Sequence, residues 1–373
     1  MNVRSGVDAP HATLGDFLRF RNGKTSPSRS ESGGVFVFGS NGAIGKTSTA
    51  NFEEPTIVIG RVGSYCGSLH YSAGPSWVTD NAIACQPKQD DDPRYWYYAL
   101  QALGLNGRSS GSGQPLLNQT ILNQIEFLPP SIPERRAIAQ VLGALDEKIA
   151  ANMQLSEIAD DYLSARFQLE LASGVDFAPL ETIAEVNAQV VKPIAGQFLR
   201  YIDIASVGVG AHSFPELTPW EDAPSRARRR VRPGDTLWST VRPNRRSHSL
   251  NLSEDSKLVA STGLAVLSPR GVGFAYLYEV TRLHGFTTHL ENVAEGSAYP
   301  AVRAEQFKAA PVPLLPPQKR VAFEDLATPI RQNLHSLDEE NRTLARLRDT
   351  LLPELMSGRL RVKDAEKQIE EVV

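Results

Sequence analysis

An internal repeat constrains the fold of this chain more than any other feature of its sequence. Two variable stretches each lead into a similar proline-rich phrase, FLPPSIPERR at residues 127–136 and PVPLLPPQKR at residues 311–320. The segments that follow also end alike, in ELASG at 170–174 and ELMSG at 354–358. A period of about 184 residues is far longer than the repeat of a solenoid, so we expect two copies of a unit made of a globular domain and a helix.

The repeat divides the 373 residues into five segments. We expect a first globular domain at 1–130, a first spacer helix at 131–174, a second globular domain at 175–314, a second spacer helix at 315–358 and a charged tail at 359–373. The length allows two domains of ordinary size, and a hydrophobic fraction of 41% is enough to form a buried core in each.

Each globular domain has the pattern of an α+β fold. Short strand-like runs are bounded by Gly, Pro, Asn and Asp, and one short helical segment follows them. The expected strands are 35–38, 56–59 and 82–85 in the first domain and 201–204, 235–241 and 263–267 in the second, with helices at 94–105 and 274–283. The two domains are therefore predicted to share one architecture, related by a pseudo-two-fold repeat.

The two spacer helices have the spacing of a coiled-coil seam. In the first, Ile138, Leu142, Leu145 and Ile149 are four, three and four residues apart, and Asn152 is next. At about 1.5 Å per residue such a helix spans nearly 60 Å. These stripes alone also fit helices that face a globular core. Two helices of similar length in one chain favour antiparallel pairing, in which a buried Asn sets the register.

The second spacer helix has two expected irregularities. Thr328 is a good N-cap and Pro329 suits the first helical position, so the long helix is predicted to start there after a short helical lead-in. Pro353 is expected to kink or fray the last turn. The predicted seam consists of Ile330, Leu334, Leu337, Asn341 and Leu344.

Positive charge is concentrated in one segment of a chain whose net charge is −3. Between residues 226 and 246 there are eight arginines and one acid, Asp235, which gives a local charge of +7. Arginine has a permanent charge and a fork geometry that suits phosphates and guanine edges, so this segment is predicted to contact nucleic acid. The alternative is a solvated loop held by salt bridges.

Motifs for catalysis are missing. The segment GSNGAIGKT at 39–47 has one residue too many for a phosphate-binding loop, and no amino-methyltransferase tetrapeptide occurs. Asp146 to Lys148 fall on the outside of the heptad, which favours a surface charge cluster over a nuclease site. Neither Cys66 nor Cys85 has the surroundings of a nucleophile or a zinc ligand. The sequence therefore predicts a protein that binds rather than reacts.

The expected location is a reducing cytoplasm. The chain has only two cysteines, and no segment at its N-terminus has the pattern of a signal peptide. No apolar run approaches the length of a membrane span, so no membrane association is expected.

The repeat, the Pro-Pro entry to each helix and the ending NRTLARLRDTLLPELMSG at 341–358 closely resemble the specificity subunit of type I restriction-modification systems. The resemblance covers about residues 14 to 362. Further motifs support it within the domains: GSNG at 39–42, GRVG at 60–63 and GSGQPLLN at 111–118 in the first, and RYIDI at 200–204, TLWSTVRP at 236–243, STG at 261–263 and GSAYP at 296–300 in the second.

The resemblance implies a non-catalytic subunit with two target-recognition domains, each reading one half of a split double-stranded DNA target. The two antiparallel helices then act as a ruler across an unread gap. Two methyltransferase subunits dock on the helices and use S-adenosylmethionine to methylate adenine, and two motor-nuclease subunits join them to cleave unmethylated phage DNA. No cofactor is expected on this chain.

The candidate DNA contacts come from both domains. For the second domain we expect Arg242, Asn244, Arg245, Arg246, Ser247 and His248 to contact base edges, and Arg228, Arg229 and Arg230 to contact phosphates. Arg226 is a further candidate for contact with DNA. For the first domain the candidates are Ser40, Asn41, Lys46, Arg61, Ser64 and Tyr65, with Gln114 and Asn118, which align with Tyr299 and Arg303. The glycines near these residues also fit structural turns.

Two other functions remain open from the sequence. The chain fits a scaffold whose paired helices and globular domains bind protein partners without reading DNA, and salt-dependent DNA binding would separate the two. A self-contained modification enzyme is disfavoured because no cofactor or catalytic motif is present.

Overall fold

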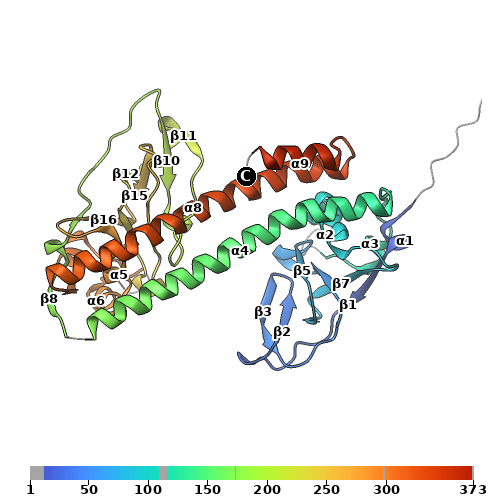
Figure 1. Cartoon of the computed structure of the whole chain (residues 1–373), viewed down its shortest axis with the longest axis horizontal. Helices are drawn as coiled ribbons and strands as arrows, with labels where there is room; N and C mark the ends of the chain where they lie inside the picture. The colour runs from blue at the N-terminus through green and yellow to red at the C-terminus, as the bar shows by residue number, and fades with distance from the viewer. Residues whose placement is uncertain (1–11, 109–115, 173, 297–298, 372–373) are drawn as a thin grey trace, which may run out of the picture. The chain divides into compact units, whose positions relative to one another are not determined.

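The computed structural model describes residues 12–108, 116–172, 174–296 and 299–371 (Figure 1). The chain forms two compact units, one made of residues 1–150 and 341–373 and the other of residues 151–340. Two 40-residue helices, α4 (Ile132–Leu171) and α8 (Pro317–Met356), contribute one half to each unit. The predicted α+β class, with two globular domains and two long helices, is confirmed.

The globular part of unit 1 contains two small sheets. One has the order β1-β7-β4-β5 with every pair antiparallel, and the other has the order β3-β2-β6 with β2 and β6 parallel. Their strands are β1 (Leu18–Asn22), β2 (Val35–Gly39), β3 (Gly42–Thr47), β4 (Thr56–Gly60), β5 (Leu69–Ser72), β6 (Ser76–Val78) and β7 (Ala82–Pro87). The expected strands at 35–38, 56–59 and 82–85 are confirmed as β2, β4 and β7.

Four helices of unit 1 complete this core together with halves of the long helices. They are α1 (Leu14–Phe17), α2 (Pro93–Ala102), α3 (Gln119–Asn123) and α9 (Val362–Glu370). The helix α2 begins where Asp92 accepts a hydrogen bond from the backbone of Arg94, with Pro93 at the first position. Buried Trp96 of α2 belongs to the same apolar cluster as Leu142 of α4 and Leu351 of α8. The core of unit 1 therefore joins the sheet domain to its helix halves.

The globular part of unit 2 contains two four-stranded sheets and a strand pair. The orders are β11-β10-β15-β12, β14-β13-β16-β9 and β17-β8. The strands are β8 (Asp176–Pro179), β9 (Ala184–Val186), β10 (Phe198–Ile202), β11 (Leu217–Pro219), β12 (Ala227–Arg230), β13 (Thr236–Ser239), β14 (His248–Leu250), β15 (Leu258–Ser261), β16 (Leu264–Pro269) and β17 (Pro311–Leu314). The three strands expected here correspond to β10, β13 and β16.

Three helices pack on these sheets: α5 (Phe274–Arg282), α6 (His284–Val293) and α7 (Ala304–Lys308). Buried Trp238 of β13, Tyr276 of α5 and Phe286 of α6 form one apolar cluster with Phe167 of α4 and Phe323 of α8. Unit 2 thus repeats the plan of unit 1, with a sheet domain packed through an aromatic helix against the long helices.

Within each unit the long helices are antiparallel. Unit 1 pairs Asp146 of α4 with Arg348 of α8 at 2.6 Å. Unit 2 pairs Asn152 with Glu340 at 2.7 Å, and farther along α4 it pairs Asp160 with Arg331 at 2.5 Å. Later residues of α4 therefore meet earlier residues of α8.

The predicted seam of the first spacer helix is confirmed by burial. Ile138, Leu142 and Leu145 are at most 3% exposed, and the polar seam residue Asn152 is also 3% exposed. The amide of Asn152 donates to the carboxylate of Glu340 on α8. A buried polar pair of this kind favours one register over its neighbours.

The expected start of the second spacer helix at Thr328 is wrong, because α8 begins at Pro317 and runs through Pro329 without a break. Proline removes one backbone hydrogen bond from a helix, but apolar packing on both sides outweighs this loss, since Phe323 and Ala327 are buried and Ile330 packs on the same cluster. Likewise α8 continues past Pro353 to Met356, where the last turn packs on the core of unit 1 through Leu355.

Among the helices in the described ranges, none combines the length and the apolar character needed to cross a membrane.

Candidate nucleic-acid interface

The connection between β13 and β14 presents the arginine-rich loop of unit 2. It contains a short 3₁₀ turn, η6 (Pro243–Arg245), which is closed by hydrogen bonds from the Arg245 and Arg246 amides to the Arg242 and Pro243 carbonyls, at 2.9 and 2.8 Å. Asn244 and Arg245 are exposed at this turn. The loop therefore displays polar side chains from a fixed backbone.

A second segment joins this loop. The amide of Arg242 donates to the carbonyl of Pro300 at 2.8 Å, and Val241 forms a β-bridge with Ala301. The guanidinium of Arg242 lies 4.6 Å from the centre of the Tyr299 ring, and Tyr299 is 70% exposed. The segments that contain Arg242 and Tyr299 were predicted separately to contact DNA. The fold brings these two segments together.

The turn between β15 and β16 links the exposed arginine before β12 to the same end of unit 2. The amide of Thr262 donates to the carbonyl of Arg226, and the amide of Thr240 donates to the carbonyl of Gly263, both at 2.9 Å. The side chain of Arg226 is exposed. Backbone hydrogen bonds of the turn therefore link the segment of Arg226 to the start of the arginine loop.

The strand β12 carries the three arginines that were predicted to contact phosphates, and they differ in exposure. Arg230 is exposed, whereas Arg228 and Arg229 are both half-buried, and the guanidinium of Arg229 donates to the backbone carbonyl of Leu264. Burial lowers the pKa of Arg229 below that of a free arginine. The side chain of Arg229 therefore has a partner within the domain, and its predicted contact with a phosphate stays a prediction.

His248 and Arg246 were both predicted to contact bases. His248 is 1% exposed and its ring stacks on Trp238 at 5.1 Å, so it does not reach a ligand from solvent. Arg246 is half-buried and donates from Nη2 to the carbonyl of Arg282 at 2.8 Å. Both residues support the backbone of the loop. The expectation that His248 contacts a base is wrong because its ring is buried, and the base contact expected of Arg246 stays a prediction. Ser247 is half-buried, and its carbonyl accepts from the Ser239 amide.

The remaining candidate of unit 2 is Arg303, at the start of α7. Its backbone amide donates to Oε1 of Gln306 at 2.6 Å, and its guanidinium pairs with Glu295 at 2.7 Å. Both side chains of this ion pair are exposed. The predicted DNA contact of Arg303 stays a prediction, and it would require nucleic acid to displace the Glu295 carboxylate.

The first domain builds an equivalent loop between β4 and β5. It contains a 3₁₀ turn, η1 (Gly63–Tyr65), in which Ser64 and Tyr65 are exposed. Val62 forms a β-bridge with Leu116, and the carbonyl of Arg61 accepts from the Leu117 amide at 3.0 Å. The segment before α3 therefore joins the loop in the same way as the segment before α7 does in unit 2.

The hairpin between β2 and β3 adds to this group. Ser40 Oγ donates to the carbonyl of Asn81 at 2.5 Å, and the amide of Arg61 donates to the same carbonyl at 3.0 Å. Asn41 is exposed at the tip of the hairpin. Lys46 lies at the other end of β3, with its ammonium 5.2 Å from the Phe36 ring, so the structure does not bring it to the loop.

Asn118 and Gln114 have different outcomes. Asn118 is the N-cap of α3, and its Oδ1 accepts from the Ile121 amide at 2.9 Å, which gives the side chain a structural role. Its predicted counterpart Arg303 holds the same N-cap position before α7. Gln114 lies outside the described residues.

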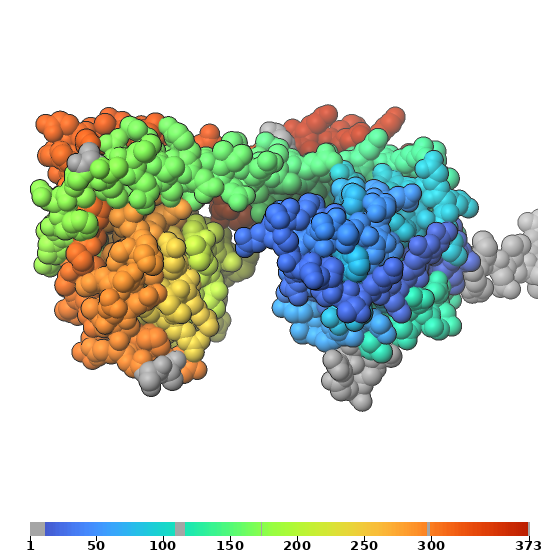
Figure 2. Space-filling view, turned by 90° about the horizontal axis from the view of Figure 1, so that it is seen from below, coloured from blue at the N-terminus to red at the C-terminus, as the bar shows by residue number. Residues whose placement is uncertain are grey.

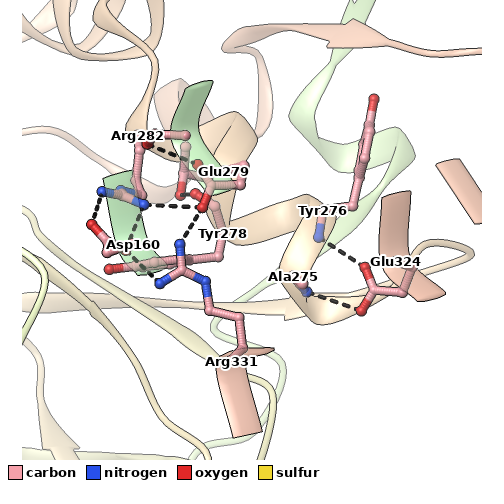
Figure 3. A network of polar contacts seen from close by, with 10 residues as sticks. Asp160, Ala275, Tyr276, Tyr278, Glu279, Arg282, Glu324 and Arg331 are labelled. Atoms are coloured by element: carbon pink, nitrogen blue, oxygen red, sulfur yellow. Dashed lines mark hydrogen bonds and ion pairs between the residues drawn. The ribbon is translucent and has the colours of Figure 1, made fainter. Parts of the chain in front are cut away.

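A buried ionic network connects the arginine loop of unit 2 to both long helices (Figure 3). Arg282 of α5 and Arg331 of α8 share two carboxylates, Asp160 of α4 and Glu279 of α5. Both guanidinium groups also lie over the Tyr278 ring, at 5.2 and 4.8 Å. Burial opposes ionisation of Asp160, but the two arginines outweigh it and hold the pKa of this carboxyl below its usual range.

The network fixes the loop because Arg246 donates to the backbone of Arg282, one of its members. Only Asp160 and Arg282 of the four charged side chains are more than 10% exposed. The sequence did not predict this network, because Arg331 lies 52 and 171 positions from its partners Glu279 and Asp160, and none of the four residues belongs to a motif.

A second surface of different character lies on the C-terminal half of α4. Leu155, Ile158, Tyr162 and Leu169 are spaced three, four and seven residues apart and are 50 to 66% exposed. Figure 2 shows this half of α4, in light green, at the surface of unit 2. An exposed apolar stripe with heptad spacing is the pattern that packs against a partner helix.

The described residues can also be compared with the requirements of a metal site and of a reactive thiol. Among the described residues, no group of three or more His, Cys, Asp or Glu side chains is placed to hold a metal ion. Burial raises the pKa of both thiols, Cys66 and Cys85, which makes them unreactive.

Comparisons with known proteins agree with these features. Residues 8–158 match the family model described as the type I restriction modification DNA specificity domain. No curated protein matches the chain. Its fold is similar to the crystal structure of the type I restriction-modification system S subunit from M. genitalium, with a TM-score of 0.64, 16% identity and coverage of 92% of this chain and 94% of that chain.

A second solved structure is the HsdS subunit from Thermoanaerobacter tengcongensis, at 15% identity over 92% of this chain and 97% of that chain, with a TM-score of 0.31. At these identities the likeness to the M. genitalium subunit establishes the fold.

Proposed function

We propose that this chain, a DNA specificity subunit of the type I restriction-modification class, reads a split DNA target with one half-site on each of its two domains. The chain itself is a non-catalytic recognition subunit. Each domain is proposed to bind one half-site.

One observation carries the proposal: the same loop frame occurs twice with different side chains. In unit 1, Arg61 accepts from the Leu117 amide beside the turn at 63–65, and in unit 2, Thr240 accepts from the Val302 amide beside the turn at 243–245. An identical frame that displays Ser64 and Tyr65 in one domain and Asn244 and Arg245 in the other suits two surfaces that read different base sequences.

The long helices α4 and α8 are the proposed docking sites for the methyltransferase subunits. DNA and a methyltransferase subunit are the partners that belong to this class of subunit. We infer that two methyltransferase subunits dock on the long helices, and that the exposed stripe of Leu155, Ile158, Tyr162 and Leu169 receives a helix of one of them.

The remaining assignments follow from this division of labour. S-adenosylmethionine is bound by the methyltransferase subunits, and two motor-nuclease subunits join the complex to cleave unmethylated DNA. The complex acts in the cytoplasm, where it meets incoming phage DNA.

Selection of DNA by the purified complex tests the proposal. The complex of this chain with its methyltransferase is incubated with a library of random duplexes, and bound DNA is sequenced. We expect two enriched words separated by a gap of fixed length and variable sequence. Binding of the selected duplex should weaken steeply between about 50 and 200 mM salt, because each phosphate contact releases counterions.

The scaffold alternative gives a different outcome in the same assay. A protein that only joins partners would enrich no words, and its binding to duplexes would show no preference for the selected sequence over random DNA. That outcome would contradict the proposal even if the complex with the methyltransferase formed normally.

A further inference from the structure

A groove of about 640 Å³ lies on one face of the sheet β11-β10-β15-β12 in unit 2. The starts of β10 and β15, the end of β12 and the segment 191–197 border it. The opposite face of the sheet is occupied, because Ile202 and Ala260 pack there in the core between the two sheets of this domain. The groove is therefore on the outer face of the sheet.

The floor of the groove is apolar. Leu199, Trp220 and Val259 belong to a small buried cluster, and all three line the groove. Val191 packs on this cluster at the border, and Ile194 beside it is 49% exposed. Exposed apolar surface that continues a buried cluster is typical of a place that another molecule covers.

The wall formed by residues 194–197 has a fixed backbone. The Gln197 amide donates to the Ile194 carbonyl at 3.1 Å, and Gly196 has a φ of 73°, which suits glycine. The carboxylate of Glu221 accepts from the Gly196 amide at 2.7 Å. The Trp220 amide donates to the Gln197 carbonyl at 2.9 Å. The turn is thus tied to the residues that follow β11, and the groove needs no ligand to form.

The rim of the groove is positively charged. Three exposed cations line it: Lys192, Arg230 and Lys257. Within the described parts of the chain none of the three is in an ion pair, and the residues lining the groove include no Asp or Glu. Asp255, two residues before Lys257, pairs with Arg200 at 2.8 Å, so its charge is already balanced. The groove therefore favours an anionic ligand.

The groove lies at the end of the sheet opposite to the arginine loop. The strand β15 runs from the groove at Leu258 to the turn at 262–263, which is hydrogen-bonded to Thr240 at the start of the arginine loop. The five residue steps from 257 to 262 span about 16 Å. Phosphates require cations but no apolar floor, so the groove is poorly suited to a DNA backbone.

We propose that this groove is a docking site for an acidic peptide segment of a partner protein. A large apolar side chain of the segment packs over Trp220 and Val259, and carboxylates on either side of it meet the cations of the rim. The apolar anchor supplies most of the affinity, and the charges orient the segment and speed its association. This inference goes beyond the proposed function, since no step of DNA reading depends on it.

Selection of peptides by the purified full chain tests the proposal. Random peptides displayed on phage are selected on the immobilised chain, and the enriched peptides are synthesised and their Kd is measured by fluorescence anisotropy. We expect the enriched peptides to share one large apolar residue flanked by Asp or Glu. Their binding should weaken as the salt concentration rises, because exposed charges are screened.

Charge reversal identifies the groove as the site. Lys192→Glu combined with Lys257→Glu should weaken the selected peptides about tenfold or more. The melting temperature should not change, because both side chains are exposed. The matched control is Lys363→Glu combined with Lys367→Glu, which makes the same charge change on exposed positions of α9 in unit 1. This control should bind the peptides as the wild-type chain does.

The apolar part of the site is tested separately with Ile194→Ser. This variant keeps all charges and the backbone turn, and it should also weaken the selected peptides. It keeps the test decisive if the double charge reversal lowers the melting temperature.

Three results would overturn the proposal. They are a selection that enriches no peptide, peptides whose binding survives both the charge reversal and Ile194→Ser, and a charge-reversed chain whose binding to duplex DNA loses salt dependence. The last result would assign the cations to DNA phosphates. Selection of a split DNA target by the wild-type complex is measured independently, so the proposed function and the docking site can fail separately.

Discussion

Replacing the buried His248 with Phe tests how the arginine loop is supported. The imidazole is 1% exposed and lies between Trp238 and Tyr278, with ring centres 5.1 and 5.7 Å away. Its Nδ1 is 2.6 Å from the Arg246 carbonyl, which requires a proton on Nδ1. Its Nε2 is buried without a hydrogen-bond partner among the described residues, so this side chain is neutral in the folded protein.

Burial lowers the pKa of His248 from 6.5 to about 4. Between these values the unfolded chain binds a proton that the folded chain does not, so the free energy of unfolding falls as the pH falls from 6.5 towards 4. A shift of this size corresponds to about 2–3 kcal/mol of stability lost between pH 7.5 and 4.5. Asp160, which pairs with Arg282 and Arg331, stays charged over this pH range because its own pKa is lowered.

His248→Phe keeps an aromatic ring on Trp238 but removes the titrating group and one hydrogen bond. At pH 7.5 we expect the variant to be less stable by about 1 kcal/mol. At pH 4.5 the order should reverse, because only the wild-type chain has lost the contribution of neutral His248. Urea unfolding at both pH values, with hydrogen exchange of the α5 amides to identify the transition of unit 2, measures the difference.

Groups other than His248 titrate in both proteins, so their effects cancel in the comparison. His284→Gln, at an exposed position of α6, controls for the removal of one histidine. Stability curves for wild type and His248→Phe that stay parallel from pH 7.5 to 4.5 would refute the reasoning, since they would mean that His248 titrates alike in the folded and unfolded chains.

Three further predictions concern the network, the phosphate contacts and the partner surface. Arg331→Ala should cost about 3–5 kcal/mol in urea unfolding, because it leaves a buried carboxylate of α5 with one partner fewer, while Arg359→Ala, in the exposed pair with Glu354, should cost far less. Arg226→Ala should flatten the salt dependence of DNA binding by about one phosphate contact without a change in melting temperature, while Arg229→Ala should instead lower the melting temperature. Ile158→Glu should abolish co-elution with the methyltransferase and leave the melting temperature unchanged, and normal co-elution would exclude the apolar stripe as the docking surface.

Much of the fold follows from local patterns in the sequence. The repeat predicted the two domains and the two long helices, because similar phrases in one chain specify similar structures. Heptad spacing predicted the buried seam from Ile138 to Asn152, since helical periodicity decides which face is buried. The start of α8 was predicted wrongly at Thr328, because local propensity favours an N-cap there while distant packing of Phe323 keeps the helix continuous.

The candidate site was predictable as a region and not residue by residue. Charge density identified the segment 226–246, but the direction of each side chain depends on the strand pairing of β12 and on the turn after β13. Arg229 donates to a carbonyl within the domain and His248 is buried for these reasons. The contact between Arg242 and Tyr299 could not be predicted from the sequence, because the two residues are 57 positions apart. A backbone hydrogen bond from Arg242 to Pro300 brings them together.

The central claim is that the two domains each read one half of a DNA target, and a map of adenine methylation tests it most directly. DNA from cells that express this chain with its methyltransferase subunit is sequenced for methylated adenine. We predict one split motif, with two defined words at a fixed distance. A methylated motif that is one continuous word, or a motif that remains when this chain is omitted, would contradict the account.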